Sequence, residues 1–282
     1  MNNKIRMVGL DLDGTLLNEK KELTAYTRKV LRAAVDAGAE ILVATGRPWM
    51  GVPEELRKFP GMRYALTSNG ARIVNTADGS VVEEHLLSPG PAKRALEICR
   101  KYDTLQEVYF DGQGYADEEK MARVEKYHKN PNMWEYFRTT RKPVPDVAVL
   151  VERENRGMDK VQALFADMEE RERAWKELDR LGELALSGSL GYNIEINAAG
   201  VNKGTGLIRL GELLGIRREE IMACGDGDND AAMLREAGFG VAMSNAEEQV
   251  KEAADYITGS NEEDGAARAI EKFVLEGGKG IC

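Results

Sequence analysis

The sequence predicts an α/β fold, a doubly wound parallel sheet interrupted by an inserted α+β domain. Near both ends of the chain, apolar strands alternate with amphipathic helices, whereas the middle shows hairpins and helices in mixed order. The chain has 282 residues, more than a single core usually holds, so two domains are expected. We place the core at residues 1–83 and 192–282 and the inserted domain at residues 84–191.

The first part of the core begins with a strand, a helix and two further strands. Strands are expected over residues 6–12, 40–45 and 63–67, and a helix is expected over residues 23–39 with Thr24 as its N-cap. Strands that alternate with helices pair in parallel through right-handed crossovers. The carboxyl ends of these strands should therefore lie along one edge of the sheet.

The inserted domain shows no regular strand–helix repeat. A hairpin is expected around the turn Ala77-Asp78-Gly79, which leads into it. Further strands are expected at residues 105–112, 146–152, 183–188 and 192–197, and helices at 91–102, up to 127 and about 158–170.

The strand–helix alternation resumes after this domain. Helices are expected at residues 203–215, 229–238, 246–254 and 265–278, alternating with strands at 220–225, 239–243 and 255–258. The economical model is one doubly wound core that is interrupted once along the chain by the inserted domain.

Composition limits the function classes. The net charge of -9 argues against a nucleic-acid partner held by phosphate contacts. No apolar run is long enough to cross a membrane, and the beginning of the chain has no signal-peptide pattern. The three cysteines, Cys99, Cys224 and Cys282, have no metal-like or disulfide-like spacing, so a reducing cytoplasm is expected. The oligomeric state is left undecided by the sequence.

Polar clusters follow four of the expected core strands. They are Asp11-Leu12-Asp13-Gly14-Thr15, Thr45-Gly46-Arg47, Ser68-Asn69-Gly70 and Gly225-Asp226-Gly227-Asp228-Asn229-Asp230. Ligands of doubly wound sheets bind outside the carboxyl ends of the strands, so these clusters are expected to converge. Converging carboxylates need a cation, and Mg2+ with oxygen ligands fits that need.

The residue types suggest phosphoryl transfer. With a metal ion present, Asp11 can attack phosphorus as a nucleophile, and Asp13 can exchange a proton with the leaving or attacking oxygen. Thr15 and Thr45 can donate to phosphate oxygens, and Lys203 at the start of a helix can supply a positive charge.

Two other motifs fit the aspartate-rich loop less well. An EF-hand needs Gly and Glu where the chain has Ala231 and Ala237. A dinucleotide-binding fingerprint needs a third glycine where the chain has Asp230. Asp228 is expected to be solvated or to cap a helix.

The combination of motifs resembles the haloacid dehalogenase (HAD) superfamily, specifically Cof-type phosphohydrolases with a class IIB cap. "LDLDGTLL", "VATGR", "NKGTGL" and "CGDGDNDAAML" are similar to its four motifs, in the same chain order. The resemblance implies a Rossmann-like core, with residues 84–191 as a cap that closes over it and sets substrate choice.

The resemblance also implies a role for each matching residue. Asp11 would form the aspartyl-phosphate, Asp13 would be the general acid/base, and Lys203 would stabilise the transferring charge. The expected metal ligands are Asp11, Asp13 through its backbone carbonyl, Asp226 and Asp230, the last directly or through water. The expected phosphate- or substrate-binding residues are Thr45, Gly46, Arg47, Asn69 and Asn229.

The predicted function is therefore an Mg2+-dependent phosphatase. Its partner would be a small phosphorylated metabolite, such as a sugar phosphate or a phosphorylated cofactor, with no nucleic acid and no membrane. A phosphomutase or phosphotransferase remains open, because an aspartyl-phosphate can also pass its phosphoryl group to a sugar. A phospho-accepting signalling module is the alternative from another class, but such modules are shorter and lack a cap.

Overall fold

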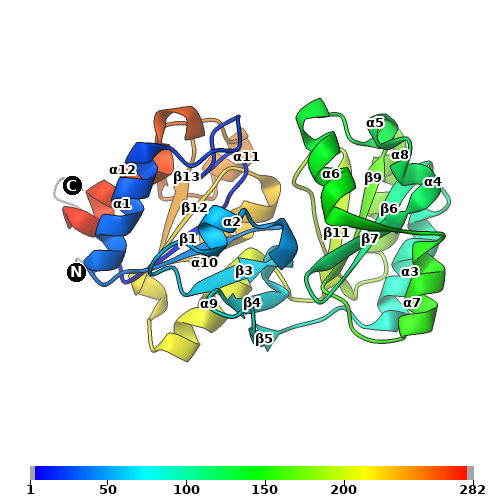
Figure 1. Cartoon of the computed structure of the whole chain (residues 1–282), viewed down its shortest axis with the longest axis horizontal. Helices are drawn as coiled ribbons and strands as arrows, with labels where there is room; N and C mark the ends of the chain where they lie inside the picture. Colours follow the sequence, from blue (N-terminus) through cyan, green and yellow to red (C-terminus); the bar gives the residue numbers. More distant parts are fainter. Residues whose placement is uncertain (1–3, 278–282) are drawn as a thin grey trace. The chain divides into compact units, whose positions relative to one another are not determined.

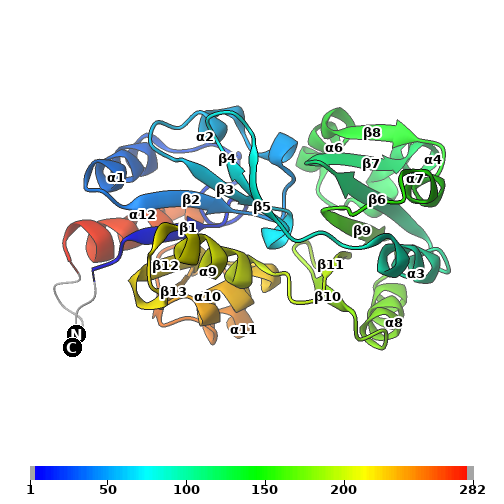
Figure 2. The same ribbon diagram turned by 90° about the horizontal axis from the view of Figure 1, so that it is seen from below.

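The computed structural model describes residues 4–277, which fold into two compact units. The first unit comprises the chain up to Gly46, Pro53–Glu83, and the chain from Asn202 onward; the second comprises Arg47–Val52 and Glu84–Val201. Figures 1 and 2 show the elements of each unit.

The first unit is built on an eight-stranded sheet in the order β14-β13-β12-β1-β2-β3-β4-β5. Its strands are β1 (Met7–Leu10), β2 (Glu40–Ala44), β3 (Tyr64–Thr67), β4 (Arg72–Asn75), β5 (Val81–Glu84), β12 (Ile221–Gly225), β13 (Phe239–Ala242) and β14 (Tyr256–Ile257). The pairs from β14 to β3 are parallel, and β4 is antiparallel to β3. The doubly wound sheet is confirmed, and its order reverses at β1.

Helices cover both faces of this sheet. They are α1 (Ala25–Asp36), α2 (Glu54–Arg57), α9 (Lys203–Leu214), α10 (Ala231–Glu236), α11 (Glu248–Lys251) and α12 (Gly265–Ile270). Helices α1 and α12 lie on one face, and α9 and α10 on the other (Figure 2). Thr24 caps α1 as predicted, with its side chain accepting from the Thr27 amide. The core packs Leu42 and Leu66 against Leu207 and Leu210 of α9.

The second unit has a six-stranded sheet in the order β10-β11-β9-β6-β7-β8. Its strands are β6 (Thr104–Phe110), β7 (Gln113–Asp117), β8 (Arg141–Val144), β9 (Lys160–Phe165), β10 (Leu184–Ser187) and β11 (Asn193–Ala198). Most neighbours are antiparallel; β7 and β8 are parallel.

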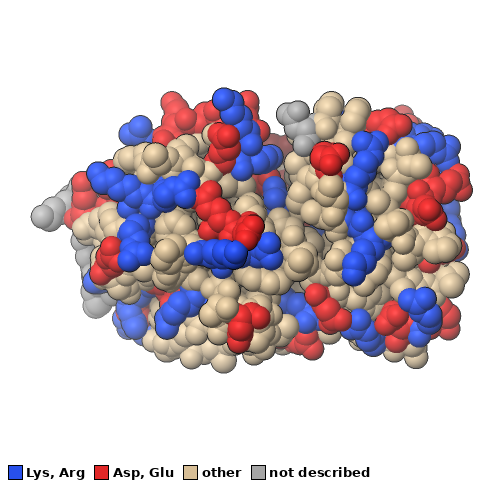
Figure 3. Space-filling view, viewed as in Figure 1, with Lys and Arg blue, Asp and Glu red and all other residues tan. Residues whose placement is uncertain are grey.

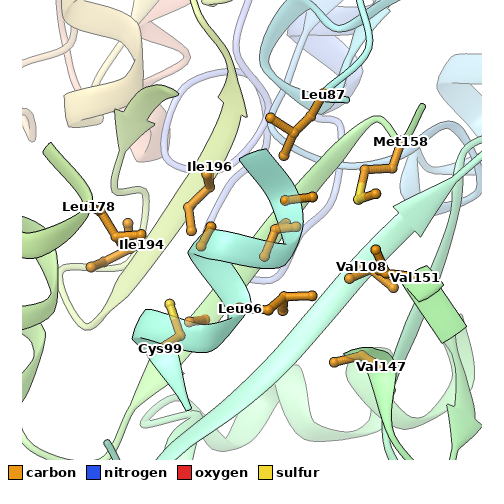
Figure 4. Packing of buried hydrophobic residues seen from close by; sticks show 14 of the residues in the cluster. Leu87, Leu96, Cys99, Val108, Val147, Val151, Met158, Leu178, Ile194 and Ile196 are labelled. Carbon is orange, nitrogen blue, oxygen red and sulfur yellow. The ribbon is translucent and has the colours of Figure 1, made fainter. Parts of the chain in front are cut away.

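Two groups of helices pack on this second sheet. The helices are α3 (Pro89–Cys99), α4 (Glu118–Met121), α5 (Val124–Tyr127), α6 (Trp134–Thr140), α7 (Val147–Glu154) and α8 (Met168–Asp179). Figure 4 shows Leu96 of α3 and Val151 of α7 packed with Val108 of β6. A second apolar cluster packs Val124 of α5 and Phe137 of α6 with Leu164. The mixed α+β architecture expected for the middle of the chain is thus present.

Two elements of the second unit differ from the sequence prediction. Residues 147–152 of the segment 146–152, predicted as a strand, belong to α7, and Asp146 is its N-cap, whose side chain accepts from the amides of Ala148 and Val149. Val147, Leu150 and Val151 form its buried stripe. Residues 158–170, predicted as a helix, contain strand β9, and helix α8 begins only at Met168.

The main segment of the second unit begins at Glu84, as expected, and ends later than the expected residue 191. Strand β11 (Asn193–Ala198) pairs with β9 and β10, so the return to the first unit comes at Asn202. The short segment Arg47–Val52 also belongs to the second unit. Arg47 donates to the Gly51 carbonyl at 3.0 Å, and its guanidinium lies 4.8 Å from the centre of the Tyr136 ring.

A buried polar network occupies part of the second sheet. The Glu107 carboxylate, which is fully buried, accepts from Arg141 Nε at 2.5 Å, Tyr109 Oη at 2.6 Å and Gln162 Nε2 at 3.0 Å. Burying these charges is costly unless every partner is present. The network therefore depends on each of its members.

Glu107→Gln is expected to lower the free energy of unfolding of the second unit by about 3 to 5 kcal/mol, because Arg141 then lies buried without a carboxylate. Chemical denaturation followed by circular dichroism measures this loss. Glu119→Gln is the matched control, since Glu119 forms an exposed ion pair with Arg123 and its loss costs about 0.5 kcal/mol. Equal effects of the two substitutions would show that the network does not stabilise the unit.

The surface carries both signs of charge. Figure 3 shows Lys and Arg side chains interspersed with Asp and Glu on the face viewed. Among residues 4–277, no helix has the length and apolar composition needed to cross a bilayer. Cys99 and Cys224 are buried free thiols, and Cys282 lies outside the described residues.

Candidate active site

The end of β1 places Asp11 at the point where the strand order reverses. All four residues of β1 are buried, and the Asp11 amide continues the pairing by donating to the Cys224 carbonyl at 3.0 Å. The Asp11 side chain is therefore held in a buried position at the edge of the sheet. Gly14 follows with φ 87°, and a Cβ there would lie 2.2 Å from Oδ2 of Asp226. Only glycine allows the loop after β1 to approach Asp226 so closely.

The loop after β12 organises Asp226 and Asp230. Oδ2 of Asp230 accepts from the amides of Asp226 and Gly227, each at 3.0 Å. Oδ1 of Asp226 accepts from the Thr15 hydroxyl at 2.6 Å. Asp230 is thus held by amides of its own loop, and Asp226 is held by a hydroxyl of the loop after β1.

Lys203 bridges these two loops. It begins helix α9, whose N-cap Asn202 forms a capping box with Thr205. Its ammonium, fully buried, contacts Oδ1 of Asp11 at 2.6 Å and Oδ1 of Asp230 at 2.7 Å. Burial alone would lower the pKa of Lys203, but attraction to Asp11 and Asp230 outweighs it, so the pKa is raised and the lysine stays charged.

Negative charge exceeds positive charge at this point. Oxygen atoms of Asp11, Asp226 and Asp230 all lie within 4.8 Å of one another. Burial and then repulsion from Asp230 raise the pKa of Asp11, and the same two causes raise the pKa of Asp226 to about 7. Carboxylates that repel each other around a single lysine fit a hard divalent cation with oxygen ligands.

Asp13 is not one of these three carboxylates, but its charge adds to the repulsion that raises the pKa of Asp11 and Asp226, and it has a basic partner. Its Oδ1 forms an ion pair with Nζ of Lys21 at 2.7 Å, and both side chains are about one-third exposed. Lys21 sits in a tight loop with φ 63°, its amide donating to the Asn18 carbonyl at 2.8 Å. Lys21 was not predicted as a site residue, because two lysines in a polar loop give no signal of this contact.

Three of the predicted phosphate-binding residues are linked. Thr45 is buried at the end of β2, next to Gly46, and its carbonyl accepts from the Asn69 amide at 3.0 Å. Oδ1 of Asn69 in turn accepts from Nδ2 of Asn229 at 3.1 Å. Asn229 directly precedes Asp230, so the chain connects these residues to the cluster of Asp11, Asp226 and Asp230.

Arg47 and Asp228, two other predicted positions, contact residues outside the three clustered carboxylates. Arg47 packs within the second unit on Tyr136, and its role toward substrate stays a prediction. Asp228 is exposed and accepts from Nε2 of Gln249 at 2.5 Å, a contact at the surface of the loop.

Comparison with known proteins identifies the family of the chain. A family model described as haloacid dehalogenase-like hydrolase matches residues 8–270. The chain is 33% identical to the 5-amino-6-(5-phospho-D-ribitylamino)uracil phosphatase YcsE of Bacillus subtilis, covering 96% of each chain. It is 28% identical to the pyridoxal phosphate phosphatase YbhA of Escherichia coli, covering 96% of this chain and 99% of the relative.

A solved structure gives the same result for the fold. A sugar phosphatase described as HAD subclass IIB superposes with a TM-score of 0.78 at 25% sequence identity, covering 95% of this chain and 98% of that one. The match extends over both units, as the sequence motifs at the two ends of the chain led us to expect. The chain belongs to the haloacid dehalogenase-like hydrolases.

Proposed function

We propose that the protein is an Mg2+-dependent phosphatase that hydrolyses a small phosphorylated metabolite through an aspartyl-phosphate on Asp11. The observation that carries the proposal is the buried contact of Lys203 with both Asp11 and Asp230, beside the carboxylate of Asp226. Such an arrangement holds a nucleophilic carboxylate in place next to a fixed positive charge.

In the first half of the reaction, a carboxylate oxygen of Asp11 attacks the phosphorus atom. The bond between phosphorus and the leaving oxygen breaks, and Asp13, which takes up a proton from solvent before this step, gives that proton to the leaving oxygen. Lys203, which keeps its proton, offsets the negative charge of the transferring group. Thr45 donates to an oxygen of that group, while Asn69 and Asn229 lie beside it.

In the second half, water attacks the phosphorus atom of the aspartyl-phosphate. Asp13, now a carboxylate, takes a proton from this water, and the bond between phosphorus and the Asp11 oxygen breaks. Inorganic phosphate leaves, and both aspartates return to their initial state. One residue thus serves as acid in the first step and as base in the second.

Asp11, Asp226, Asp230 and the backbone carbonyl of Asp13 would hold the metal ion. Bound Mg2+ supplies positive charge that neutralises carboxylates and phosphate oxygens. The excess of carboxylates over lysine at this site supports the assignment.

The substrate class follows from the relatives. Those compared act on a ribitylaminouracil phosphate, pyridoxal phosphate or a sugar phosphate, according to their names. All three are phosphate esters of small polar molecules, and we propose a substrate of this kind. The buried free thiols of Cys99 and Cys224 support a reducing compartment, and we propose the cytoplasm.

Phosphate release from a panel of these three substrate types, with Mg2+ and with EDTA, tests the proposal. Release that requires Mg2+ and returns when the ion is restored is the expected result. Release that EDTA leaves unchanged would overturn the metal dependence, and no release from any panel member would overturn the substrate class.

The affinity for Mg2+ is expected to fall as the pH is lowered below 7. Asp226 has a raised pKa of about 7, so below that pH it keeps a proton that the ion must displace. Between about pH 6 and about pH 5 the apparent affinity should fall at least about tenfold, and above about pH 8 it should be constant. Calorimetric titration with Mg2+ measures this, and a flat profile would contradict the raised pKa. Asp228→Asn, an exposed change, should leave the profile unaltered.

A further inference from the structure

The turn after β3 has an unusual backbone. Ser68, Asn69 and Gly70 form a 3-10 turn in which φ is positive at three consecutive residues, 50°, 59° and 92°. Two of these residues are not glycine, and the left-handed region is costly for them. Such a conformation persists only where the surrounding structure holds it.

Helix α9 packs directly on this turn. A Cβ at Gly70 would lie 2.4 Å from the Asn202 carbonyl oxygen, and a Cβ at Gly206 would lie 3.0 Å from Cα of Gly70. Glycine at both positions lets the backbone of the turn touch the first turns of the helix. The helix that carries Lys203 therefore also positions residues 68–70.

One side chain of α9 holds the turn by a polar contact. Nη2 of Arg209 donates to the Gly70 carbonyl at 2.7 Å, and Nε of Arg209 pairs with Oε1 of Glu83 at 3.1 Å. The side chains of Arg209 and Glu83 are 19% and 25% exposed, so the pair is largely shielded from water. A charged donor to a carbonyl oxygen is among the stronger hydrogen bonds.

The 3-10 turn also places Asn69 beside Thr45 and Asn229 of the candidate active site. The Asn69 amide donates to the Thr45 carbonyl at 3.0 Å, and its side-chain oxygen accepts from Asn229 at 3.1 Å. Asn69 and Asn229 are both buried, next to the loop that holds Asp230. A shift of the turn would move Asn69 away from Asn229.

We propose that Arg209 is a positioning residue for phosphoryl transfer, which acts through the Gly70 carbonyl to hold Asn69 against Asn229. The inference rests on the proposed phosphatase function. Arg209 itself contacts neither nucleophile nor metal ligands among the described contacts; its guanidinium fixes the conformation of residues 68–70. Misplacing a phosphate-binding group by about 1 Å lowers the rate of the reaction.

Arg209→Met removes both polar contacts and keeps much of the apolar stem. It is expected to lower kcat between about tenfold and a hundredfold, with KM changed less, because the transition state is held more closely than the substrate. Arg209→Lys, which keeps a charged donor, should recover part of kcat. Arg217→Met is the matched control, because Arg217 is an exposed arginine paired with Glu219 and Glu220.

A double-mutant cycle separates positioning from general stability. If Arg209 acts through Asn69, Arg209→Met should change kcat less than about twofold in an Asn69→Ala background. A loss of kcat of the same size in both backgrounds would overturn the proposal. So would an unchanged kcat in the folded Arg209→Met single variant, with folding verified by circular dichroism.

Binding of inorganic phosphate in the presence of Mg2+ gives a second readout that needs no turnover. Arg209→Met should weaken this binding by about threefold, less than it lowers kcat, and this effect too should vanish in the Asn69→Ala background. Wild-type protein that binds phosphate but releases none from any substrate would count against the proposed function alone. Unchanged phosphate binding in Arg209→Met would count against the positioning role.

Discussion

Asp11→Asn is expected to reduce phosphate release by at least about a thousandfold while the protein stays folded. Asparagine has nearly the shape of aspartate, but its amide cannot attack phosphorus as a carboxylate does. The substitution also removes one of the mutually repelling carboxylates, and Lys203 keeps its contact with Asp230 at 2.7 Å. The thermal transition should therefore be no lower than that of the wild type.

Steady-state phosphate release and thermal unfolding measure the two parts of this prediction. Asp228→Asn serves as the matched control, since it makes the same chemical change at an exposed residue of the loop that carries Asp226. That variant should keep close to wild-type activity. Near-full activity of Asp11→Asn in the presence of Mg2+ would contradict the assignment of Asp11 as the nucleophile.

Lys203→Met is expected to lower both activity and stability. Activity should fall at least about a hundredfold, because the fixed positive charge beside the transferring group is lost. Without divalent ions, the free energy of unfolding should also fall by about 3 to 5 kcal/mol, since Asp11 and Asp230 then lie buried without their cation. Lys58→Met is the control for stability, because Lys58 is an exposed lysine paired with Glu54.

The stability loss of Lys203→Met should depend on pH. The pKa of Asp11 is raised in the folded protein, so that carboxyl is destabilising when ionised and ceases to be so as it binds a proton. The loss should therefore be smaller in acid than at neutral pH. Denaturation at several pH values measures this, and a loss that grows in acid would show that Lys203 does not compensate these carboxylates.

Much of the site could be predicted because it follows regular elements. Asp11, Thr45 and Asp226 each come directly after a strand of the parallel sheet, and Asn69 comes two residues after one, where sequence periodicity is clear. Lys203 begins a helix with a recognisable N-cap. Strand ends of a doubly wound sheet share one edge, so the convergence of these residues could be predicted as well.

The second unit was harder to predict, for identifiable reasons. Residues 147–154 are rich in β-branched valines, a strand signal, and the helix is decided by the Asp146 cap and burial of one stripe. In β9 the polar Lys160 and Gln162 alternate with the apolar Val161 and Ala163, a strand pattern obscured by the neighbouring helix α8. In segments this short, tertiary packing decides between helix and strand.

Contacts between distant residues lay beyond sequence reasoning. The pairing of Lys21 with Asp13 and the bond from Arg209 to Gly70 depend on loop conformation and helix placement. The membership of Arg47 in the second unit likewise depends on its packing against Tyr136. None of these residues belongs to a pattern whose spacing alone implies its partner.

Trapping the phosphorylated enzyme tests the central claim most directly. Enzyme mixed with a substrate and Mg2+ is quenched in acid during turnover, reduced with borohydride, and digested for mass spectrometry of the peptide that contains Asp11 and Asp13. Reduction converts an aspartyl-phosphate to homoserine, so the spectrum identifies which residue carried the phosphoryl group. The account predicts homoserine at position 11 alone. Homoserine at position 13, or turnover with no modified aspartate, would contradict it.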